Sequence, residues 1–575
     1  MRLCLALVTL LAAVPAAAQP AAFGQYRRAA DYPDIATSSQ YVTMRDGVRL
    51  AVRVDRPARG TSVAEGRFPV IWHHTLSISS TSRDGVGGPA SATRSMPDLV
   101  GYGYVVVQVA RRGNGQSFGV RRGYHDRIEA EDAYEMTEWL ARQSFSNGRV
   151  GIYGCSNTGD AAMHAMAMLP PALRAVFAGC FSWHKYDAFR RGGIFAQWGT
   201  GPVRRVEDDV ALPAVDGDTD KVLLRQAAQE HLQSTPLFEL WSQMPHRDSF
   251  SPLVMSRFWE EGSVATYRQR LARSQAALYI LGGWFDELRD QGIVTHLNMP
   301  GSRLVIGPWK HCLNDGFDLQ SEMLRFFDFH LKGIDNGLAA MPRVHLAVTD
   351  TNGAMNWIAR NGWEEIPSET TRYFAGDGGR LDTRRLRLAP LALPPGPSPA
   401  CPEAGTGSTI QPCPSHGEGV HFEGAPLARD ATVLGYGQIE LSVDAASDVP
   451  IFAYLEDVAP DGAIRAVTEG RLLASLASEQ PAPWIMPRGL PWRRAWAADA
   501  QPVRAGRPVR LHFELMPTAW RFLAGHRIRI RIATADHRQR GVENFAWPRV
   551  TLLGGAQAPV VSLPMRDTAP QSLPR

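Results

Sequence analysis

The stretch RVGIYGCSNTGDAAMHAM, residues 149–166, decides the fold. An apolar run with strand character ends at Gly154-Cys155-Ser156, and a segment of small, helix-compatible residues follows at once. A serine on a sharp turn between a strand and a helix is typical of a nucleophilic hydroxyl held clear of the backbone. The alternative is a structural turn that needs small residues such as Gly154 and Gly159.

Strands and helices alternate on both sides of this stretch. Two segments, 127–142 and 319–333, carry apolar residues at helical spacing. Apolar runs typical of buried strands lie at 68–72, 102–110, 174–180, 276–284 and 303–307. The alternation predicts an α/β fold with a mostly parallel sheet and helices on both faces.

A chain of 575 residues is long enough for more than one domain. The segment 186–272 is rich in Arg, Gln, Trp and His with helix-like runs, which predicts a helical cap over a binding site or a separate helical domain. Beyond residue 370 the runs alternate with period two, as in an antiparallel sandwich, and we expect a jelly roll. The predicted divisions are a leader at 1–18, an α/β domain at 38–185 and 273–355 that encloses the cap, and the jelly roll at 370–570.

The N-terminus predicts a secretory signal peptide. Arg2 is followed by an apolar core at 3–14 and by small residues at 16–18, so we expect the mature chain to begin near Gln19. The alternative, a short membrane anchor, is disfavoured because the apolar core is brief and ends at Pro15. The protein is therefore predicted to be exported, in the periplasm or outside the cell.

The composition excludes some classes of function. Hydrophobic residues make up 44% and charged residues 21%, as in ordinary soluble proteins, and the net charge of +4 lacks the basic clusters of nucleic-acid binders. An exported protein can form disulfides, and Cys401 and Cys413 are the expected pair because they are close in sequence. No Cys/His spacing resembles a zinc site, so we expect no metal.

A nucleophilic serine needs a base and a carboxylate that orients the base. In α/β-hydrolases the chain order is Ser, acid, His, each on a loop after a strand. Downstream of Ser156, the run AALYILGGWFD ends in Asp286 and RLVIGPWKH ends in His311. Glu287 and Asp290 are rival acids. The ordered set predicts a catalytic triad of Ser156, Asp286 and His311.

At these positions the chain resembles the cocaine esterase and X-Pro dipeptidyl-peptidase (CocE/NonD) family of serine hydrolases. The motifs that carry the resemblance are MRDGVRLAVRVDRP (44–57), RRGNGQSFG (111–119), GCSNTG (154–159), GGWFD (282–286), GPWKH (307–311), FFDFHLKG (326–333) and FLAGHRIRIRI (522–532). The resemblance implies an α/β-hydrolase fold and a C-terminal jelly-roll domain. It also implies Ser156 as nucleophile, His311 as general base and acid, and Asp286 as the orienting carboxylate, with no cofactor.

The oxyanion hole is expected to use the backbone N–H of Asn157, the residue after the nucleophile. The family's second donor is a tyrosine after the first core strand, and the corresponding stretch PVIWHHTLSISS (69–80) has none. Ser77 is the positional match, and His74 is the alternative donor. Trp284 and Trp309 adjoin the catalytic loops, where they either line the substrate pocket or pack the core.

The predicted activity is hydrolysis of ester or amide bonds of small acyl substrates through an acyl-enzyme. We expect a small-molecule substrate and no nucleic-acid or membrane partner, and an oligomer is compatible with the sequence. One alternative is an X-Pro dipeptidyl-peptidase, which needs an acidic anchor for the substrate ammonium. The other is a glycan- or protein-binding protein whose catalytic site has degenerated.

Overall fold

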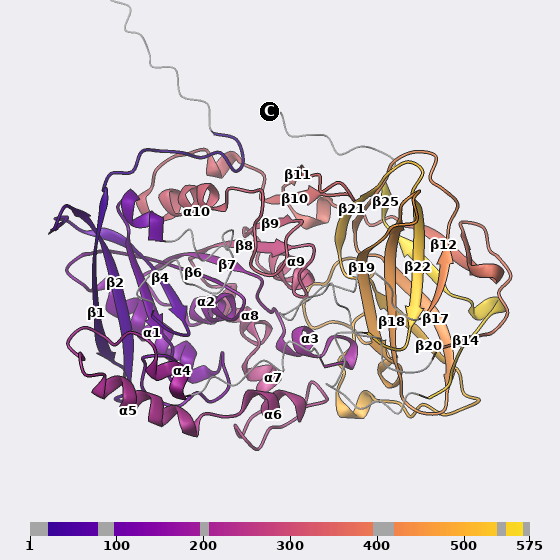
Figure 1. Cartoon of the computed structure of the whole chain (residues 1–575), viewed down its shortest axis with the longest axis horizontal. Coiled ribbons are helices and arrows are strands. Elements are labelled where there is room, and N and C mark those ends of the chain that lie inside the picture. Colours follow the sequence, from indigo (N-terminus) through magenta and orange to yellow (C-terminus); the bar gives the residue numbers. More distant parts are fainter. Residues whose placement is uncertain (1–20, 79–96, 196–205, 395–418, 537–547, 567–575) are drawn as a thin grey trace, which may run out of the picture.

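The computed structural model describes residues 21–78, 97–195, 206–394, 419–536 and 548–566. Figure 1 shows two parts side by side: a sheet flanked by helices, coloured indigo to pink, and a domain of strands coloured orange and yellow. The predicted α/β domain followed by an all-β domain is confirmed. The expected leader at 1–18 and the expected Cys401–Cys413 pair lie outside the described residues.

The first part is built on an 11-stranded sheet in the order β1-β2-β5-β4-β6-β7-β8-β9-β10-β11, with β3 paired to β2. The strands from β5 through β10 run parallel, and β1, β2 and β11 are antiparallel additions at the edges. The bounds are β1 (Asp34–Thr43), β2 (Arg49–Arg59), β3 (Ser62–Val63), β4 (Phe68–Thr75), β5 (Val105–Ala110), β6 (Ser146–Cys155), β7 (Leu173–Gly179), β8 (Ala277–Gly283), β9 (Arg303–Gly307), β10 (Val344–Val348) and β11 (Asn356–Arg360).

Both faces of this sheet are covered, which explains why its strands are continuous apolar runs. On β6, Ile152 joins the core under α1, α2 and α9, and its neighbour Tyr153 joins the core under α10. The helices of the domain are α1 (Arg127–Ala141), α2 (Asn157–Ala167), α3 (Lys185–Phe189), α9 (Arg289–Asn298) and α10 (Leu319–Phe327). The carboxyl ends of the parallel strands therefore meet at one edge, where ligands bind in open α/β sheets.

The span predicted as a cap holds short helices. They are α4 (Val206–Val210), α5 (Val222–Glu230), α6 (Leu237–Ser242), α7 (Phe258–Glu261) and α8 (Arg268–Leu271). Several of their residues contact the loop after β5: Glu230 accepts a hydrogen bond from Gly119 N–H, and Glu261 pairs with Arg122. These contacts place the segment over the loop that follows a core strand at its carboxyl end.

The second part is an all-β domain whose strands surround a shared apolar core. One sheet has the order β14-β23-β17-β24-β12-β13-β15-β22-β18-β19 with β20 paired to β17, and a smaller sheet has the order β21-β16-β25. The finer jelly-roll topology stays a prediction. The bounds are β12 (Thr371–Gly376), β13 (Arg380–Asp382), β14 (Leu391–Leu393), β15 (Val420–Glu423), β16 (Ala431–Gly435), β17 (Gln438–Ala445), β18 (Pro450–Val458), β19 (Ile464–Leu473), β20 (Val509–Glu514), β21 (Thr518–Phe522), β22 (Arg527–Ala533), β23 (Val550–Leu552), β24 (Val560–Leu563) and β25 (Met565–Arg566).

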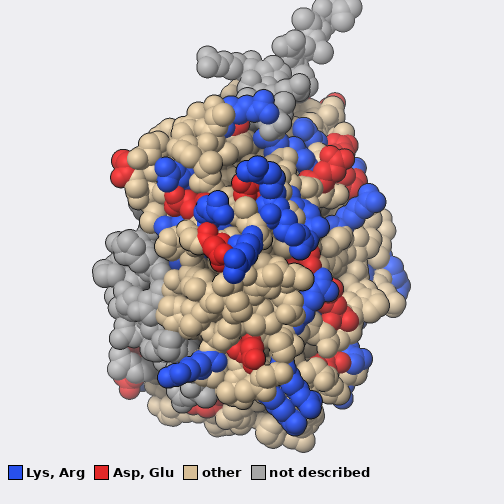
Figure 2. All heavy atoms as spheres, turned by 90° about the vertical axis from the view of Figure 1, so that its right-hand side faces the viewer, with Lys and Arg blue, Asp and Glu red and all other residues tan. Residues whose placement is uncertain are grey.

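The outer face of the all-β domain carries charges of both signs. Figure 2 shows basic side chains gathered in its upper part with acidic side chains among them. Exposed arginines of this domain pair with nearby acids, as Arg384 does with Asp382 and Arg527 with Glu423. Within the described residues, no helix combines the length and apolar character needed to cross a bilayer.

Asp328, at the end of α10, joins three segments of the α/β domain. Its buried carboxylate accepts hydrogen bonds from Tyr26 Oη (3.0 Å), Arg28 Nε (2.7 Å) and Tyr104 Oη (2.7 Å). The N-terminal segment is thereby fastened to the sheet and to the helix beneath it.

Replacing Asp328 by Ala is expected to lower the free energy of unfolding by about 3 kcal/mol, because buried donors and the Arg28 charge lose their partner. Urea denaturation followed by fluorescence measures the change. The exposed Asp335 supplies a matched control, since Asp335→Ala should shift the midpoint little. An Asp328→Ala midpoint equal to that of the control would contradict the assignment.

Candidate active site

Ser156 stands on a sharp turn between β6 and α2. Its backbone has φ 61° and ψ −128°, a conformation that L-residues rarely adopt and that functional sites retain. The preceding Cys155 closes the turn, because its N–H donates to Thr158 Oγ1 (2.9 Å) and its carbonyl accepts from the same hydroxyl (2.9 Å). The serine hydroxyl is therefore raised above the end of the strand.

Two glycines make this turn sterically feasible. A Cβ on Gly154 would lie 2.1 Å from Thr158 O, and a Cβ on Gly159 would lie 2.5 Å from Gly179 O. The second contact is with the end of the adjacent strand β7 and explains why the glycine stands at 159 and not at 158. Both glycines flank Ser156 because the backbone passes too close for any side chain.

The structure brings Ser156, Asp286 and His311 together from loops after β6, β8 and β9. The Ser156 Oγ and His311 Nε2 atoms are 2.7 Å apart, and His311 Nδ1 is 2.9 Å from Asp286 Oδ2. The other Asp286 oxygen accepts the Leu288 N–H at 2.9 Å. Because Nδ1 faces the carboxylate, Nε2 is the atom free to accept the serine proton.

The charges around Asp286 and His311 suit His311 to act as a base. Burial by itself raises the pKa of Asp286, but His311 and hydrogen bonds from Cys180 and Leu288 N–H outweigh burial and leave that pKa below its ordinary value. Burial likewise lowers the pKa of His311, but the charge and hydrogen bond of Asp286 leave it raised. Asp286 is thus ionised and stabilises a proton on the imidazole.

The rival acids are engaged elsewhere. Glu287 pairs with Arg471 of β19, and both side chains are buried. Asp290 accepts two hydrogen bonds from the Arg191 guanidinium, each of 2.7 Å. Of the three neighbouring carboxylates, Asp286 alone contacts His311 among the described residues.

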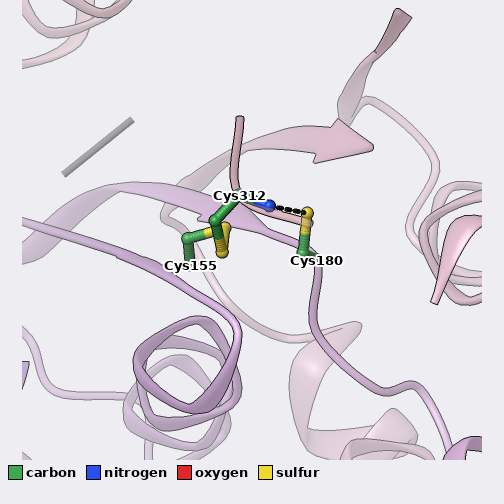
Figure 3. A group of neighbouring side chains, drawn as sticks. All are labelled: Cys155, Cys180 and Cys312. Atoms are coloured by element: carbon green, nitrogen blue, oxygen red, sulfur yellow. Dashed lines mark hydrogen bonds between the residues drawn. A yellow bond between two sulfur atoms is a disulfide. The ribbon is translucent and has the colours of Figure 1, made fainter. Parts of the chain in front are cut away.

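An unpredicted disulfide, Cys155–Cys312, joins the residue before Ser156 to the residue after His311. Figure 3 shows it beside the buried thiol of Cys180. The signal in the sequence was the adjacency itself: if Ser156 meets His311, their neighbours Cys155 and Cys312 are also brought close. The pair predicted from sequence distance, Cys401 and Cys413, lies outside the described residues and stays a prediction.

Two sets of side chains among the described residues have atoms close enough to bind one metal ion. In each set the potential ligand atoms lie within 4.8 Å of one another: Cys155, Cys180 and Cys312 in one, and Cys180, Asp286 and His311 in the other. In the first set two sulfurs share a disulfide, and in the second the carboxylate and imidazole bind each other.

Asn157 begins α2, so its N–H lies in the first helical turn and has no partner within the helix. The Asn157 side chain and the Asn157 carbonyl both accept hydrogen bonds from buried residues. Arg111, fully buried, donates to Asn157 Oδ1, and His125 Nε2 lies 2.7 Å from the Asn157 carbonyl. Lys185 Nζ donates to His125 Nδ1, which fixes the ring with its proton on Nε2. The sequence alone does not reveal this cluster, because isolated Arg, His and Lys residues ordinarily lie on the surface.

The other oxyanion candidates lie near the end of β4. Ser77 is half-buried in the following bend, and a Cβ on Gly115 would come within 2.9 Å of its Cα and Cβ. His74 is 2% exposed, and burial followed by the Arg111 charge holds its pKa well below the ordinary value, so its ring is neutral. The role of either residue as the second donor stays a prediction.

The two tryptophans lie in the core. Trp284 is fully buried and its indole donates to Ala347 O at 2.7 Å. Trp309 is 2% exposed, packs against Phe317 and Trp357, and donates to Asp315 O at 3.0 Å. The structure favours core packing over the pocket-lining alternative for both.

Comparison with known proteins fits this geometry. Residues 46–313 match the X-Pro dipeptidyl-peptidase (S15 family), and residues 336–544 match the X-Pro dipeptidyl-peptidase C-terminal non-catalytic domain. A candidate serine esterase of Mycobacterium bovis is 31% identical over 88% of this chain and 91% of its own. The chain belongs to the X-Pro dipeptidyl-peptidase (S15) family.

Other similar proteins agree with this assignment. Cocaine esterase of Rhodococcus is 24% identical over 87% of this chain and 90% of its own. Among solved structures, a CocE/NonD family hydrolase of Staphylococcus aureus superposes with a TM-score of 0.70 at 18% identity, covering 93% of this chain and 96% of its own. An α-amino acid ester hydrolase superposes with a TM-score of 0.67 at 17% identity, covering 96% and 100%. These likenesses confirm the predicted family and fold, and the protein is a serine hydrolase.

The pKa shifts of the pair give a test in this S15-family enzyme. His311 must be neutral to accept a proton, so kcat/KM falls as the pH drops below its raised pKa. Replacing Asp286 by Asn removes the charge that raises this pKa, so the acid limb should move to lower pH while kcat falls by about 10⁴-fold. Profiles of kcat/KM against pH with an activated aryl ester measure both effects. An acid limb that stays in place would contradict the assignment of Asp286.

Proposed function

We propose that the enzyme cleaves ester or amide bonds of small acyl substrates through an acyl-enzyme on Ser156. Ser156 Oγ attacks the carbonyl carbon as His311 Nε2 takes its proton, and the imidazolium then protonates the leaving alcohol or amine. Water attacks the acyl-enzyme with His311 as base and releases the acid. Asp286 holds the ring and stabilises its charge throughout.

The observation that carries this proposal is the continuous hydrogen-bonded line from Ser156 through His311 to Asp286. Its two links measure 2.7 and 2.9 Å, within the range for a nucleophile bonded to its base. The raised turn at Ser156 supports the same role, because it exposes the hydroxyl at the carboxyl edge of the sheet.

We assign the Asn157 N–H as the first oxyanion donor. It follows the nucleophile at the start of a helix, where the positive end of the helix dipole also favours negative charge. The second donor is proposed to come from the end of β4, from Ser77 or from the neutral ring of His74. A Ser77→Ala and a His74→Phe variant distinguish the two, since loss of one donor costs about 10²–10³-fold in kcat.

For the substrate we favour simple esters and amides over X-Pro peptides. A dipeptidyl-peptidase needs a carboxylate to bind the substrate ammonium. Two buried carboxylates flanking Asn157 are already engaged: Asp160 accepts hydrogen bonds from Ser182, and Glu129 accepts from His125 N–H and pairs with Arg111. The names of the relatives, which include a cocaine esterase and an α-amino acid ester hydrolase, support the ester class.

We also propose that the protein is exported to the periplasm or beyond. The leader-like sequence supports this, and the Cys155–Cys312 disulfide supports it independently, because disulfides persist in oxidising compartments. N-terminal sequencing of the protein from the producing cells should find a chain that starts near Gln19. A chain that retains residues 1–18 in the cytoplasm would contradict export.

Fluorophosphonate labelling with peptide mass spectrometry tests the proposed nucleophile. The wild-type enzyme should carry the adduct on Ser156, and Ser156→Ala should lose both the adduct and about 10⁴-fold or more of kcat. Ser62→Ala, on the exposed edge strand β3, is the matched control and should label normally. A folded wild-type protein that remains unlabelled, or that labels elsewhere, would overturn the proposal.

A further inference from the structure

Three cysteines lie together beside Ser156, Asp286 and His311, and each lies at the end of a strand or in the loop that follows one. Cys155 ends β6, Cys180 follows β7, and Cys312 lies in the loop after β9. Figure 3 shows the Cys155–Cys312 disulfide with the Cys180 sulfur beside it and the Cys312 N–H directed at that sulfur. Their sulfur atoms lie within 4.8 Å of one another.

The disulfide connects the two loops whose side chains must meet. Cys155 is bonded through one peptide to Ser156, and Cys312 through one peptide to His311. The bond spans a sequence separation of 157 residues and joins Cα atoms 5.9 Å apart. It is the one covalent cross-link that the described residues contain, and it lies at the nucleophile and the base rather than at a domain boundary or terminus.

Cys180 extends the connection to the third loop. Its buried thiol accepts the Cys312 N–H at 3.4 Å, and its sulfur lies within 4.8 Å of a carboxylate oxygen of Asp286 and a ring nitrogen of His311. The acid loop and the base loop therefore both approach one sulfur, and the base loop is covalently joined to the nucleophile loop.

We propose that the Cys155–Cys312 disulfide is a positioning element of the active site, which holds His311 against Ser156 and makes the activity depend on the oxidation state of the enzyme. This inference rests on the proposed function, because it assigns the bond to the same Ser156–His311 pair. Neither cysteine is itself a catalytic residue, since both act through their neighbours.

The physical reason lies in the geometry of proton transfer. His311 is 24% exposed, and the described hydrogen bonds of its ring are those to Asp286 and to Ser156 itself. A displacement of about 1 Å between nucleophile and base costs on the order of 10²-fold in rate. A covalent bond beside both residues restricts such displacements without occupying the reacting atoms.

The third cysteine does not open the bond from within. Burial, and then the charge of Asp286 and the hydrogen bond to it, raise the pKa of the Cys180 thiol well above its ordinary value. Cys180 therefore stays a thiol. Because only a thiolate attacks a disulfide, Cys180 does not attack the Cys155–Cys312 bond. Opening therefore needs an external dithiol: dithiothreitol is oxidised to its cyclic disulfide, the Cys155–Cys312 bond breaks, and each of these sulfurs gains a proton.

The experiment compares the oxidised and reduced enzyme in a C401S/C413S background, so that Cys155–Cys312 is the bond under test. Reduction is verified by alkylation and mass spectrometry, and folding by circular dichroism. We expect kcat for an activated aryl ester to fall by about 10- to 100-fold with KM changed little, and the rate of fluorophosphonate labelling at Ser156 to fall in parallel. Reoxidation should restore both.

A C155A/C312A variant is the second arm, and it should show the same low kcat in the absence and presence of dithiothreitol. A purely structural bond would lower the melting temperature and leave kcat of the folded enzyme unchanged, which would overturn the proposal. Oxidised enzyme that is not labelled at Ser156 at all would instead refute the proposed function. Equal labelling before and after reduction would refute the positioning role alone.

Discussion

The hydrogen bond between Ser156 Oγ and His311 Nε2 is the constraint on which the structure of the site depends. It joins residues 155 positions apart with a separation of 2.7 Å. A parallel sheet satisfies that demand, because it brings the carboxyl ends of β6, β8 and β9 to one edge. The positive φ of Ser156 raises the hydroxyl there, and the glycines at 154 and 159 provide the space for the turn.

The all-β domain contacts the acid loop directly. On either side of Asp286, Phe285 packs edge-on against Trp520 of β21, and Glu287 pairs with Arg471 of β19. Arg289 donates to Thr468 Oγ1 at 3.3 Å. These contacts begin one residue from Asp286, so the second domain supports the position of the Asp286 carboxylate although none of Ser156, Asp286 and His311 belongs to it.

The nucleophile is supported differently, by buried charge. Two separate sets of hydrogen bonds end on Asn157, whose N–H is the proposed oxyanion donor: Arg111 donates to its side chain, and Lys185 donates to His125, which contacts its carbonyl. Burial, and then the neighbouring cations, lower the pKa of His125, so its ring stays neutral and donates to the Asn157 carbonyl.

The sequence was sufficient for the fold and for the three side chains of Ser156, Asp286 and His311 that meet at the edge of the sheet, because strand periodicity and chain order are local or ordered signals. It was not sufficient for the disulfide, since pairing depends on which loops meet in space and Cys155 and Cys312 are far apart in the chain. Nor could the sequence show whether Trp284 lines the pocket or packs in the core, because a tryptophan in either role can follow an apolar strand.

The most direct test of the central claim is to capture the covalent intermediate. Rapid acid quenching during turnover of an aryl ester, followed by peptide mass spectrometry, should find one acyl group on Ser156 that disappears as substrate is exhausted. Turnover without an acylated Ser156, or with the acyl group on another residue, would contradict the account.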